Sequence, residues 1–231
     1  MRALILPGMD GSGALLTDFI AALAPDIAAE VVSFPSDSLL GYDALLPFAL
    51  DRLPRETPFL LIGESFSGPL AMRIAALRPQ GLIALVLCAT FATSPRPRLR
   101  RLRPILRLPL PMPPLEMLMP LMMGRWTTPT WTFRQQNAMR GLTASVVRHR
   151  LSEVLGVNET ESLSDVTAPL FYLQARHDRL VPSHSWDEIR RIQPAAKYVE
   201  LEGPHFILQH QPRAAAAAIR QFVSSLPGAD H

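Results

Sequence analysis

Residues 63–68 read GESFSG, and they stand between an apolar run at residues 58–62 and a helix-like stretch at residues 69–77. This order predicts a strand, a sharp turn and a helix, with Ser65 on the turn. So tight a turn strains the backbone of its central residue and requires small residues two positions before and after it. Gly63 and Ser67 meet that requirement. The stretch therefore predicts a nucleophilic serine raised at the end of a strand.

A glycine-rich turn near the start of the chain supports acyl-transfer chemistry. The strand-like residues 3–6 run into PGMDGSG at residues 7–13, before an amphipathic stretch at 14–24. Such a turn leaves backbone N–H groups uncovered, and acyl transfer needs these donors where an oxygen becomes negative. We expect the amides of Met9 and Phe66 to form this oxyanion hole. A plain structural turn and a phosphate loop are the alternatives, but no lysine follows the glycines and the G-x-G-x-x-G spacing fails.

Two further polar residues follow predicted strands. Asp178 comes after the strand-like residues 169–174, and His205 comes after residues 197–201. An acid just past a strand end is well placed to orient a histidine. The order serine, acid, histidine along the chain predicts a catalytic triad of Ser65, Asp178 and His205.

Each of these residues also has a structural interpretation. Ser65 could cap the following helix, and Asp178 could form a turn. Asp165 is a rival acid, but it precedes its strand and so falls at the opposite edge of the predicted sheet from Ser65. Five other histidines compete with His205, yet only His205 falls in the loop after the last predicted strand.

Together these features resemble the α/β-hydrolase superfamily, in a compact form similar to its serine esterases, over nearly the whole chain. Similar members carry a glycine turn, an elbow serine, an acid in a D-x-(L/V)-V-P context and a histidine in a G-x-H context. DRLVP at residues 178–182 and GPH at residues 203–205 match the last two. The resemblance implies that Ser65 is the nucleophile, that His205 is the general base and then acid, and that Asp178 orients His205.

Two positions depart from the family pattern. Pro7 stands where many members have histidine, which leaves the loop amides available. Ser67 stands where the second elbow glycine usually is, and it adds a hydroxyl beside the nucleophile. Neither departure removes a residue that the chemistry needs.

Apolar and helix-like segments alternate along the chain. Strands are predicted near residues 3–6, 30–34, 59–62, 83–88, 169–174 and 197–201, and helices near residues 14–24, 43–53, 66–78, 185–193 and 212–226. This alternation predicts an α/β protein with a mostly parallel sheet covered on both faces. We expect the α/β-hydrolase fold with about six strands flanked by helices and with an inserted helical cap, and without the two antiparallel edge strands that usually open this fold.

Residues 94–161, here called the cap segment, break the alternation. Nine prolines between residues 95 and 129 predict short helices and turns, and six of the nine methionines lie in this segment. We expect a core domain of residues 1–93 and 162–231, with the cap segment inserted over the active site. The methionines could form a pocket for acyl chains or small hydrophobic esters, or could simply pack the cap onto the core.

Charge in the cap segment is one-sided. Residues 94–150 hold eleven arginines and a single acid, Glu116, and six of the arginines fall between residues 96 and 107. A solvated basic face is one interpretation. The other is a docking face for an acidic protein such as a carrier, an anionic phospholipid surface or a substrate carboxylate. Nucleic acid is not expected, because no aromatic residues interleave with the arginines.

Composition limits the remaining function classes. A 231-residue chain that is 48% hydrophobic can bury a core without disulfides, and Cys88 is its only cysteine. With one cysteine and no metal-binding histidine spacing, neither a metal at His177 nor any cofactor is expected. The first six residues are too short an apolar run for a signal peptide, and no stretch is long and apolar enough to cross a membrane. We therefore expect a cytoplasmic protein with no integral membrane segment.

The most specific function that these residues predict is hydrolysis of a small-molecule carboxylic ester through an acyl-enzyme. A thioesterase or acyltransferase acting on carrier-bound acyl groups is the first alternative. A catalytically inactive protein that binds ligands through the same fold is the second, although the presence of Ser65, Asp178 and His205 argues against it.

Overall fold

A six-stranded parallel sheet forms the centre of the computed structural model, which describes residues 1–226. In chain order the strands are β1 (Arg2–Leu6), β2 (Ala28–Val31), β3 (Phe59–Glu64), β4 (Leu82–Cys88), β5 (Leu170–Ala175) and β6 (Lys197–Leu201). Their order in the sheet is β2-β1-β3-β4-β5-β6, and every pairing is parallel. The fold class predicted from the sequence is confirmed. The winding reverses between β2 and β3, so the carboxyl ends of β1 and β3 flank the crevice where such sheets bind ligands.

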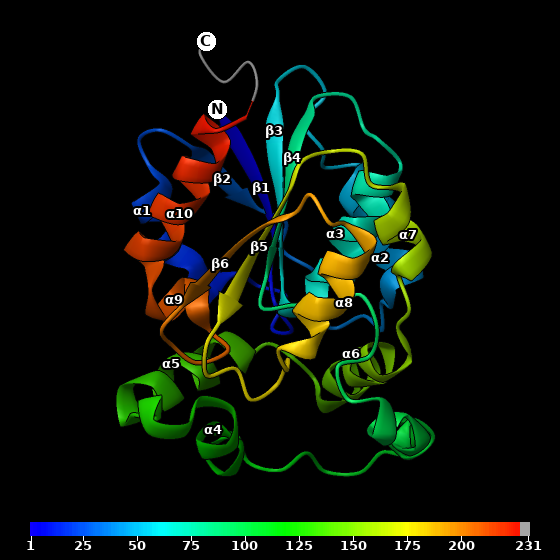
Figure 1. The fold of residues 1–231 in the computed structure, drawn as a ribbon. Helices are drawn as coiled ribbons and strands as arrows, with labels where there is room; N and C mark the ends of the chain where they lie inside the picture. Colours follow the sequence, from blue (N-terminus) through cyan, green and yellow to red (C-terminus); the bar gives the residue numbers. More distant parts are fainter. Residues whose placement is uncertain (227–231) are drawn as a thin grey trace.

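Helices cover both faces of the sheet (Figure 1). One face carries α1 (Thr17–Leu23), α9 (Ile207–His210) and α10 (Pro212–Ser224). The other carries α2 (Tyr42–Leu50), α3 (Gly68–Ala76), α7 (Thr160–Asp165) and α8 (His184–Ile192). The four inner strands are therefore buried on both sides, which is why they read as continuous apolar runs in the sequence.

Alternate residues of each strand feed two separate cores. On β1, Leu4 and Leu6 pack against the α2 and α3 side, whereas Ala3 and Ile5 pack against the α1 and α10 side. This two-residue period is what a pleated strand imposes. The second strand ends earlier than the sequence predicts, because the Phe34 N–H bonds to the Gly11 carbonyl and draws the chain toward the first loop.

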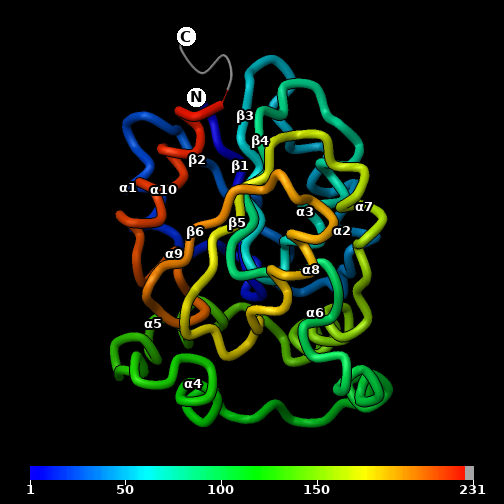
Figure 2. Tube along the Cα trace, viewed as in Figure 1, coloured from blue at the N-terminus to red at the C-terminus, as the bar shows by residue number. Residues whose placement is uncertain are grey.

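The cap segment leaves the sheet after β4 and forms a layer beyond the carboxyl ends of the strands, at the end of the molecule opposite Met1 (Figures 1 and 2). It contains η3 (Pro97–Leu102), η4 (Ile105–Arg107), α4 (Leu115–Met123), η5 (Gly124–Trp126), α5 (Pro129–Met139) and α6 (Ala144–Gly156). Helix α5 begins at a proline behind Thr128, whose hydroxyl caps the Trp131 N–H at 3.2 Å. An isolated antiparallel bridge between Thr93 and Asn158 closes the neck of this excursion.

Candidate active site

Ser65 lies on the turn that joins β3 directly to the short helix η2 (Ser65–Ser67) and then to α3. Its φ angle is +49°, in the left-handed region that residues with a side chain rarely adopt. Such a conformation persists only where the surrounding structure enforces it, and it projects the hydroxyl away from the sheet. The backbone at Ser65 thus has the strained geometry that the sequence predicted for the turn.

Close packing holds this turn in place. A Cβ atom at Gly63 would come within 2.7 Å of the Ala71 Cβ, and one at Gly68 would come within 2.0 Å of the Thr90 hydroxyl. Both positions therefore require glycine. The Thr90 hydroxyl also donates to the Ser65 carbonyl at 2.5 Å. Ser67, whose hydroxyl the sequence left without a role, is buried and donates to the Pro7 carbonyl of the first loop.

Ser65, His205 and Asp178 form one continuous chain of hydrogen bonds. Ser65 Oγ lies 2.7 Å from His205 Nε2, and His205 Nδ1 lies 2.7 Å from Asp178 Oδ2. The other carboxylate oxygen, Asp178 Oδ1, accepts the N–H groups of Leu180 and Val181, each at 2.8 Å. The acid thus has a fixed position. The structure thus brings together three residues that span 140 positions of the sequence.

The surroundings of His205 favour the protonated form of its ring more than bulk water does. Burial by itself disfavours the imidazolium, but the attraction and hydrogen bond of Asp178 outweigh it, with a further contribution from Glu64. The pKa of His205 is consequently raised above its ordinary value. A histidine in this setting accepts a proton from Ser65 readily and stabilises the resulting positive charge.

The first loop, residues 7–13, places Met9 in the wall of the cavity that Ser65 and His205 also line. The Gly8 carbonyl accepts the Gly11 N–H at 3.0 Å, which closes a tight turn. Because C=O and N–H point in opposite directions across a trans peptide, the Met9 N–H points away from that turn. The Met9 carbonyl is held on its other side by Arg150 Nη1 at 2.7 Å.

The Phe66 amide is the second predicted donor, and it follows the serine directly. The Phe66 carbonyl accepts the Tyr42 hydroxyl at 2.8 Å, and the two rings stack with centroids 4.9 Å apart. Met9 and Phe66 line one cavity with Ser65 and His205. Four of the five residues predicted for the site therefore face a common space, and Asp178 lies behind His205.

Glu64, for which we predicted no function, is buried directly before the serine. Its two carboxyl oxygens accept the Gly8 N–H at 3.3 Å and the Gln209 side-chain amide at 2.6 Å. Burial raises the pKa of Glu64 to about 7, although the Gln209 hydrogen bond lowers it. Glu64 therefore connects the first loop, the elbow strand and α9 beneath the site. A glutamate ending an otherwise apolar strand was the signal in the sequence.

Arg150 is a second residue that sequence reasoning missed, and it has the largest side chain among those fully buried. It comes from α6 of the cap segment and donates to the carbonyls of Met9 and Pro35, at 2.7 and 3.0 Å. The guanidinium carbon lies 5.8 Å from the ring centroids of both Phe34 and Phe66. Burial lowers the pKa of Arg150. The spacing of buried Val146 and Arg150 on one helix face was the available signal.

The cavity in front of Ser65 has a volume of about 860 Å³. The cap segment contributes to its walls residues 95–99, which include Arg96, Arg98 and Leu99, together with Leu121 and three residues of α6. The remaining walls come from the core, through the residues named above and Phe91, Leu180, Val181, His184 and Arg179. The walls next to the serine are mostly apolar, so the cavity suits an apolar group better than a charged one.

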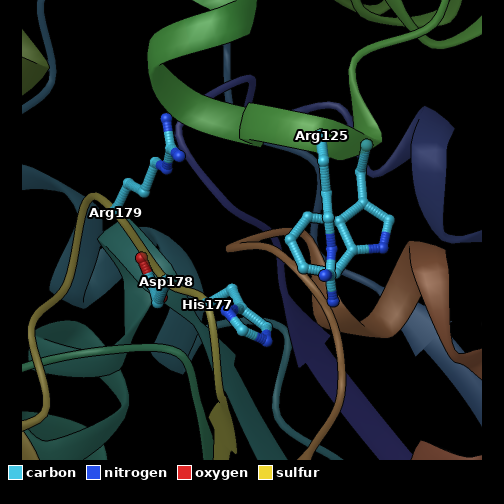
Figure 3. A pocket seen from close by; sticks show the side chains of 5 residues that line it. Arg125, His177, Asp178 and Arg179 are labelled. Atoms are coloured by element: carbon cyan, nitrogen blue, oxygen red, sulfur yellow. The ribbon is translucent and has the colours of Figure 1, made fainter.

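A smaller pocket of about 270 Å³ lies between the cap segment and the loop that carries Asp178 (Figure 3). Figure 3 shows Arg125 reaching from the cap segment toward His177, with Asp178 and Arg179 on the neighbouring loop. Arg125 and His177 both contact the Glu202 carboxylate, at 2.6 and 2.8 Å. This pocket holds no serine and does not include His205, so it does not compete with the larger cavity.

Among residues 1–226, no group of three or more histidine, cysteine, aspartate or glutamate side chains is arranged to hold a metal ion. Within the same residues, no helix is both long enough and apolar enough to cross a membrane.

Comparison with known proteins places the chain in a family. The model of the Alpha/beta hydrolase family matches residues 3–219, and the chain belongs to that family. No protein among the curated sequences matches it.

Solved structures with the same fold extend over nearly all of the chain. It is similar to an enol-lactonase from Burkholderia xenovorans LB400, with 14% identity, a TM-score of 0.74, and coverage of 97% of this chain and 91% of the lactonase. It is also similar to a thermophilic esterase from Thermogutta terrifontis, with 17% identity, a TM-score of 0.77, and coverage of 97% of this chain and 89% of the esterase. A third similar structure is a putative non-heme bromoperoxidase, BpoC from Mycobacterium tuberculosis H37Rv. Its identity is 15% and its TM-score is 0.77, with coverage of 98% of this chain and 93% of BpoC. At these identities the likeness shows the fold alone.

Proposed function

We propose that this protein is a serine hydrolase that cleaves carboxylic esters through an acyl-enzyme. The observation that carries the proposal is the unbroken chain from Ser65 Oγ through His205 to Asp178, with both distances at 2.7 Å. Two of the similar structures are an esterase and an enol-lactonase, which agrees with ester chemistry, although a shared fold alone does not assign it.

In the first half of the proposed reaction, Ser65 Oγ attacks the ester carbonyl carbon while His205 Nε2 takes its proton. Asp178 keeps the Nδ1–H side of the ring oriented and stabilises the imidazolium. The amides of Met9 and Phe66 donate to the oxygen that becomes negative. The C–O bond to the alcohol then breaks, and the alcohol leaves with the proton from His205.

In the second half, water occupies the position of the departed alcohol. His205 takes a proton from this water, whose oxygen attacks the acyl carbon bound to Ser65. Collapse of the second tetrahedral intermediate breaks the bond to Ser65 Oγ, which recovers its proton from His205. The products are a carboxylic acid and the free enzyme, and no cofactor takes part.

We further propose that the cap segment covers the cavity and sets the substrate range. Its leucines, together with Phe91 and Val181 of the core, support an acyl chain of medium length as the group bound there. Arg96 and Arg98, which line the cavity, favour thioesters of an anionic carrier as the second candidate. A cytoplasmic location stays a prediction.

The test is hydrolysis of p-nitrophenyl esters from acetate to laurate by the wild type and by Ser65→Ala. We expect kcat to fall by about 10⁴-fold or more in the variant, because the nucleophile acts as a unit with the other triad members. Mass spectrometry of the quenched wild-type reaction should find the acyl group on the peptide that contains Ser65.

Ser224→Ala provides the matched control, since Ser224 is exposed at the last residue of α10 and does not line the cavity. It should keep full activity. An active Ser65→Ala variant would mean that the serine mechanism is wrong. A wild type with neither turnover nor an acyl adduct on any ester or thioester would favour the binding protein instead.

A further inference from the structure

Exposed apolar side chains are concentrated in one part of the cap segment. Twelve large apolar side chains are exposed in residues 1–226, and seven of them fall between residues 99 and 121. These seven are Leu99, Leu102, Ile105, Leu108, Leu110, Met117 and Leu121. The other five are scattered over the rest of the chain. Surface apolar residues that gather in this way mark an interaction site more often than isolated ones do.

Arginines share the same stretch, and most of them have no partner. Within residues 1–226, the side chains of Arg98, Arg100, Arg101 and Arg107 are exposed or near the surface and make no hydrogen bond or ion pair. The only acid of residues 94–150, Glu116, accepts a hydrogen bond from Gln136 and is not near these arginines in sequence. The stretch therefore carries an uncompensated positive charge.

The segment that carries both kinds of side chain runs along one end of the molecule (Figures 1 and 2). Residues 96–121, here called the arginine–leucine face, run through η3 and η4, along an extended link and into α4 (Figures 1 and 2). The two ends of this stretch meet at the cavity, because Leu99 and Leu121 both line it. The arginine–leucine face therefore borders the cavity of the proposed active site.

We propose that the arginine–leucine face docks the protein on an anionic lipid surface and presents the cavity to molecules held there. Guanidinium groups bind lipid phosphates, while neighbouring leucines enter the boundary between headgroups and acyl chains. An acidic protein would match the charge, but it would not require so many apolar side chains between the arginines.

The extended link at residues 108–114 fits this docking. Its sequence LPLPMPP contains four prolines, which have no backbone N–H to leave unsatisfied. Placing exposed backbone in a lipid interface is costly where its polar groups lose water. The prolines reduce that cost, and Leu108 and Leu110 project from the same link. The proposal goes beyond ester hydrolysis and does not depend on it.

The test measures sedimentation of the full chain with vesicles of phosphatidylcholine alone and of phosphatidylcholine with phosphatidylglycerol as a third of the lipid. We expect binding to the anionic vesicles that weakens as salt is raised. The charge variant is Arg100→Gln, Arg101→Gln and Arg107→Gln together. At about fivefold per arginine, it should lower the apparent affinity on the order of 100-fold.

The apolar variant is Leu102→Asn, Ile105→Asn and Leu108→Asn together, and it should lower the affinity by about tenfold or more. Neither variant touches a residue that lines the cavity, so turnover of a short soluble ester should be unchanged in both. Two control variants change equally exposed residues elsewhere and should bind like the wild type. They are Arg55→Gln, Arg191→Gln and Arg213→Gln together, and Leu39→Asn and Leu77→Asn together.

Several outcomes would overturn the proposal. The wild type could fail to bind anionic vesicles, or the control variants could lose binding as strongly as the variants of the face. If the charge variant loses vesicle binding and the apolar variant does not, the face binds through charge alone. That result would favour an acidic protein as the partner and contradict docking on lipid. Vesicle binding is measured without turnover, so the two proposals can fail separately. A protein that binds anionic vesicles but hydrolyses no ester would support lipid docking and contradict the proposed function.

Discussion

The core side and the cap side of the cavity are built in opposite ways. On the core side, Ser65, His205 and Asp178 are linked by bonds of 2.7 Å, and the carboxylate of Asp178 is only 1% exposed. On the cap side, Leu99 and Leu121 line the cavity while remaining largely exposed. The proposed chemistry therefore rests on buried groups with fixed partners, and the proposed contact with substrate rests on side chains that have room to move.

The difference has an energetic basis. Breaking a buried hydrogen bond leaves a polar group unsatisfied, which costs about 1–3 kcal/mol, so the core side has one preferred arrangement. An exposed leucine loses little when it changes rotamer. Substitutions on the core side should accordingly lower kcat or stability, and substitutions on the cap side should change KM for particular substrates.

The largest effect should come from Asp178→Asn. The asparagine keeps the shape but not the charge, so His205 loses both its orientation and its stabilised positive form. We expect kcat to fall by about 10⁴-fold, as loss of the triad acid does elsewhere. Because Asp178 raises the pKa of His205, the rise of any residual kcat/KM with pH should move to lower pH in the variant. Steady-state kinetics with a p-nitrophenyl ester across pH measures both.

Asp165→Asn is the matched control for that prediction. Asp165 is the other acid that the sequence offers, and it ends α7 rather than following a strand. Its replacement should leave both kcat and the pH profile unchanged. If Asp165→Asn reduces kcat more than Asp178→Asn does, the acid has been misassigned and the core side is less fixed than the distances suggest.

The next effect concerns stability and pH at Glu64, whose folded pKa is about 7. A carboxyl whose pKa is raised on folding contributes stability that is fully present below its unfolded pKa and is lost as pH rises through the folded value. The wild type should therefore lose stability relative to Glu64→Gln between about pH 4.5 and pH 7. The difference should approach about 3 kcal/mol. Urea unfolding of both proteins across this pH range measures the difference. If the free energies of unfolding of the two proteins change with pH in parallel, the burial of a titrating carboxyl at Glu64 is contradicted.

The sequence predicted the parts of the molecule that depend on local pattern. The inner strands are buried on both faces, so each appears as an apolar run, and the site residues follow the ends of β1, β3, β5 and β6. That is enough to propose Ser65, Asp178 and His205 from their order alone. The small residues around the elbow were predictable for the same reason, since a turn of that shape excludes larger ones.

The contacts between the cap segment and the core could not be predicted in this way. Arg150 reaches the Met9 carbonyl across 141 positions of sequence, whereas Arg148 has the same side chain but occupies another face of the helix. Which face turns inward depends on how α6 packs against the first loop and the rest of the cap segment. The bond between Tyr42 and the Phe66 carbonyl depends likewise on the packing of α2 against the elbow.

Arg150 joins the cap side of the cavity to the core side, because it comes from α6 and donates to the Met9 carbonyl. Its replacement should lower kcat less than the loss of Asp178 does. Replacing it with methionine removes the donor that holds the Met9 carbonyl, so the first loop, which carries the proposed oxyanion donor, loses part of its support. We expect kcat to fall by about 10- to 100-fold with little change in KM, less than the loss of an oxyanion donor itself. Adding guanidinium ion to Arg150→Ala should restore part of the lost kcat, which a purely structural role would not produce. Ester kinetics with and without guanidinium measures this.

Two further variants make the result interpretable. Arg150→Lys keeps a buried positive charge and should retain more activity than Arg150→Met if the charge and donor matter. Arg148→Ala removes the adjacent arginine, which donates to the Leu110 carbonyl at 2.5 Å within the cap segment, and should leave kcat unchanged. Equal losses in all three variants would assign the effect to the stability of α6 and not to the loop.

The smallest effect should come from Leu121→Ala on the cap side. Leu121 is 63% exposed and lines the cavity, so its truncation removes contact with a long acyl chain but leaves little buried space. We expect KM for the longest ester to rise by about two- to fivefold, with kcat and acetate hydrolysis unchanged, since a lost methylene contact is worth about 1 kcal/mol. Met117→Ala, on the same helix and 71% exposed but outside the cavity, should change neither. A fall in kcat for all esters in Leu121→Ala would instead mean that the cap segment helps to hold the catalytic groups, and the contrast between the two sides would no longer hold.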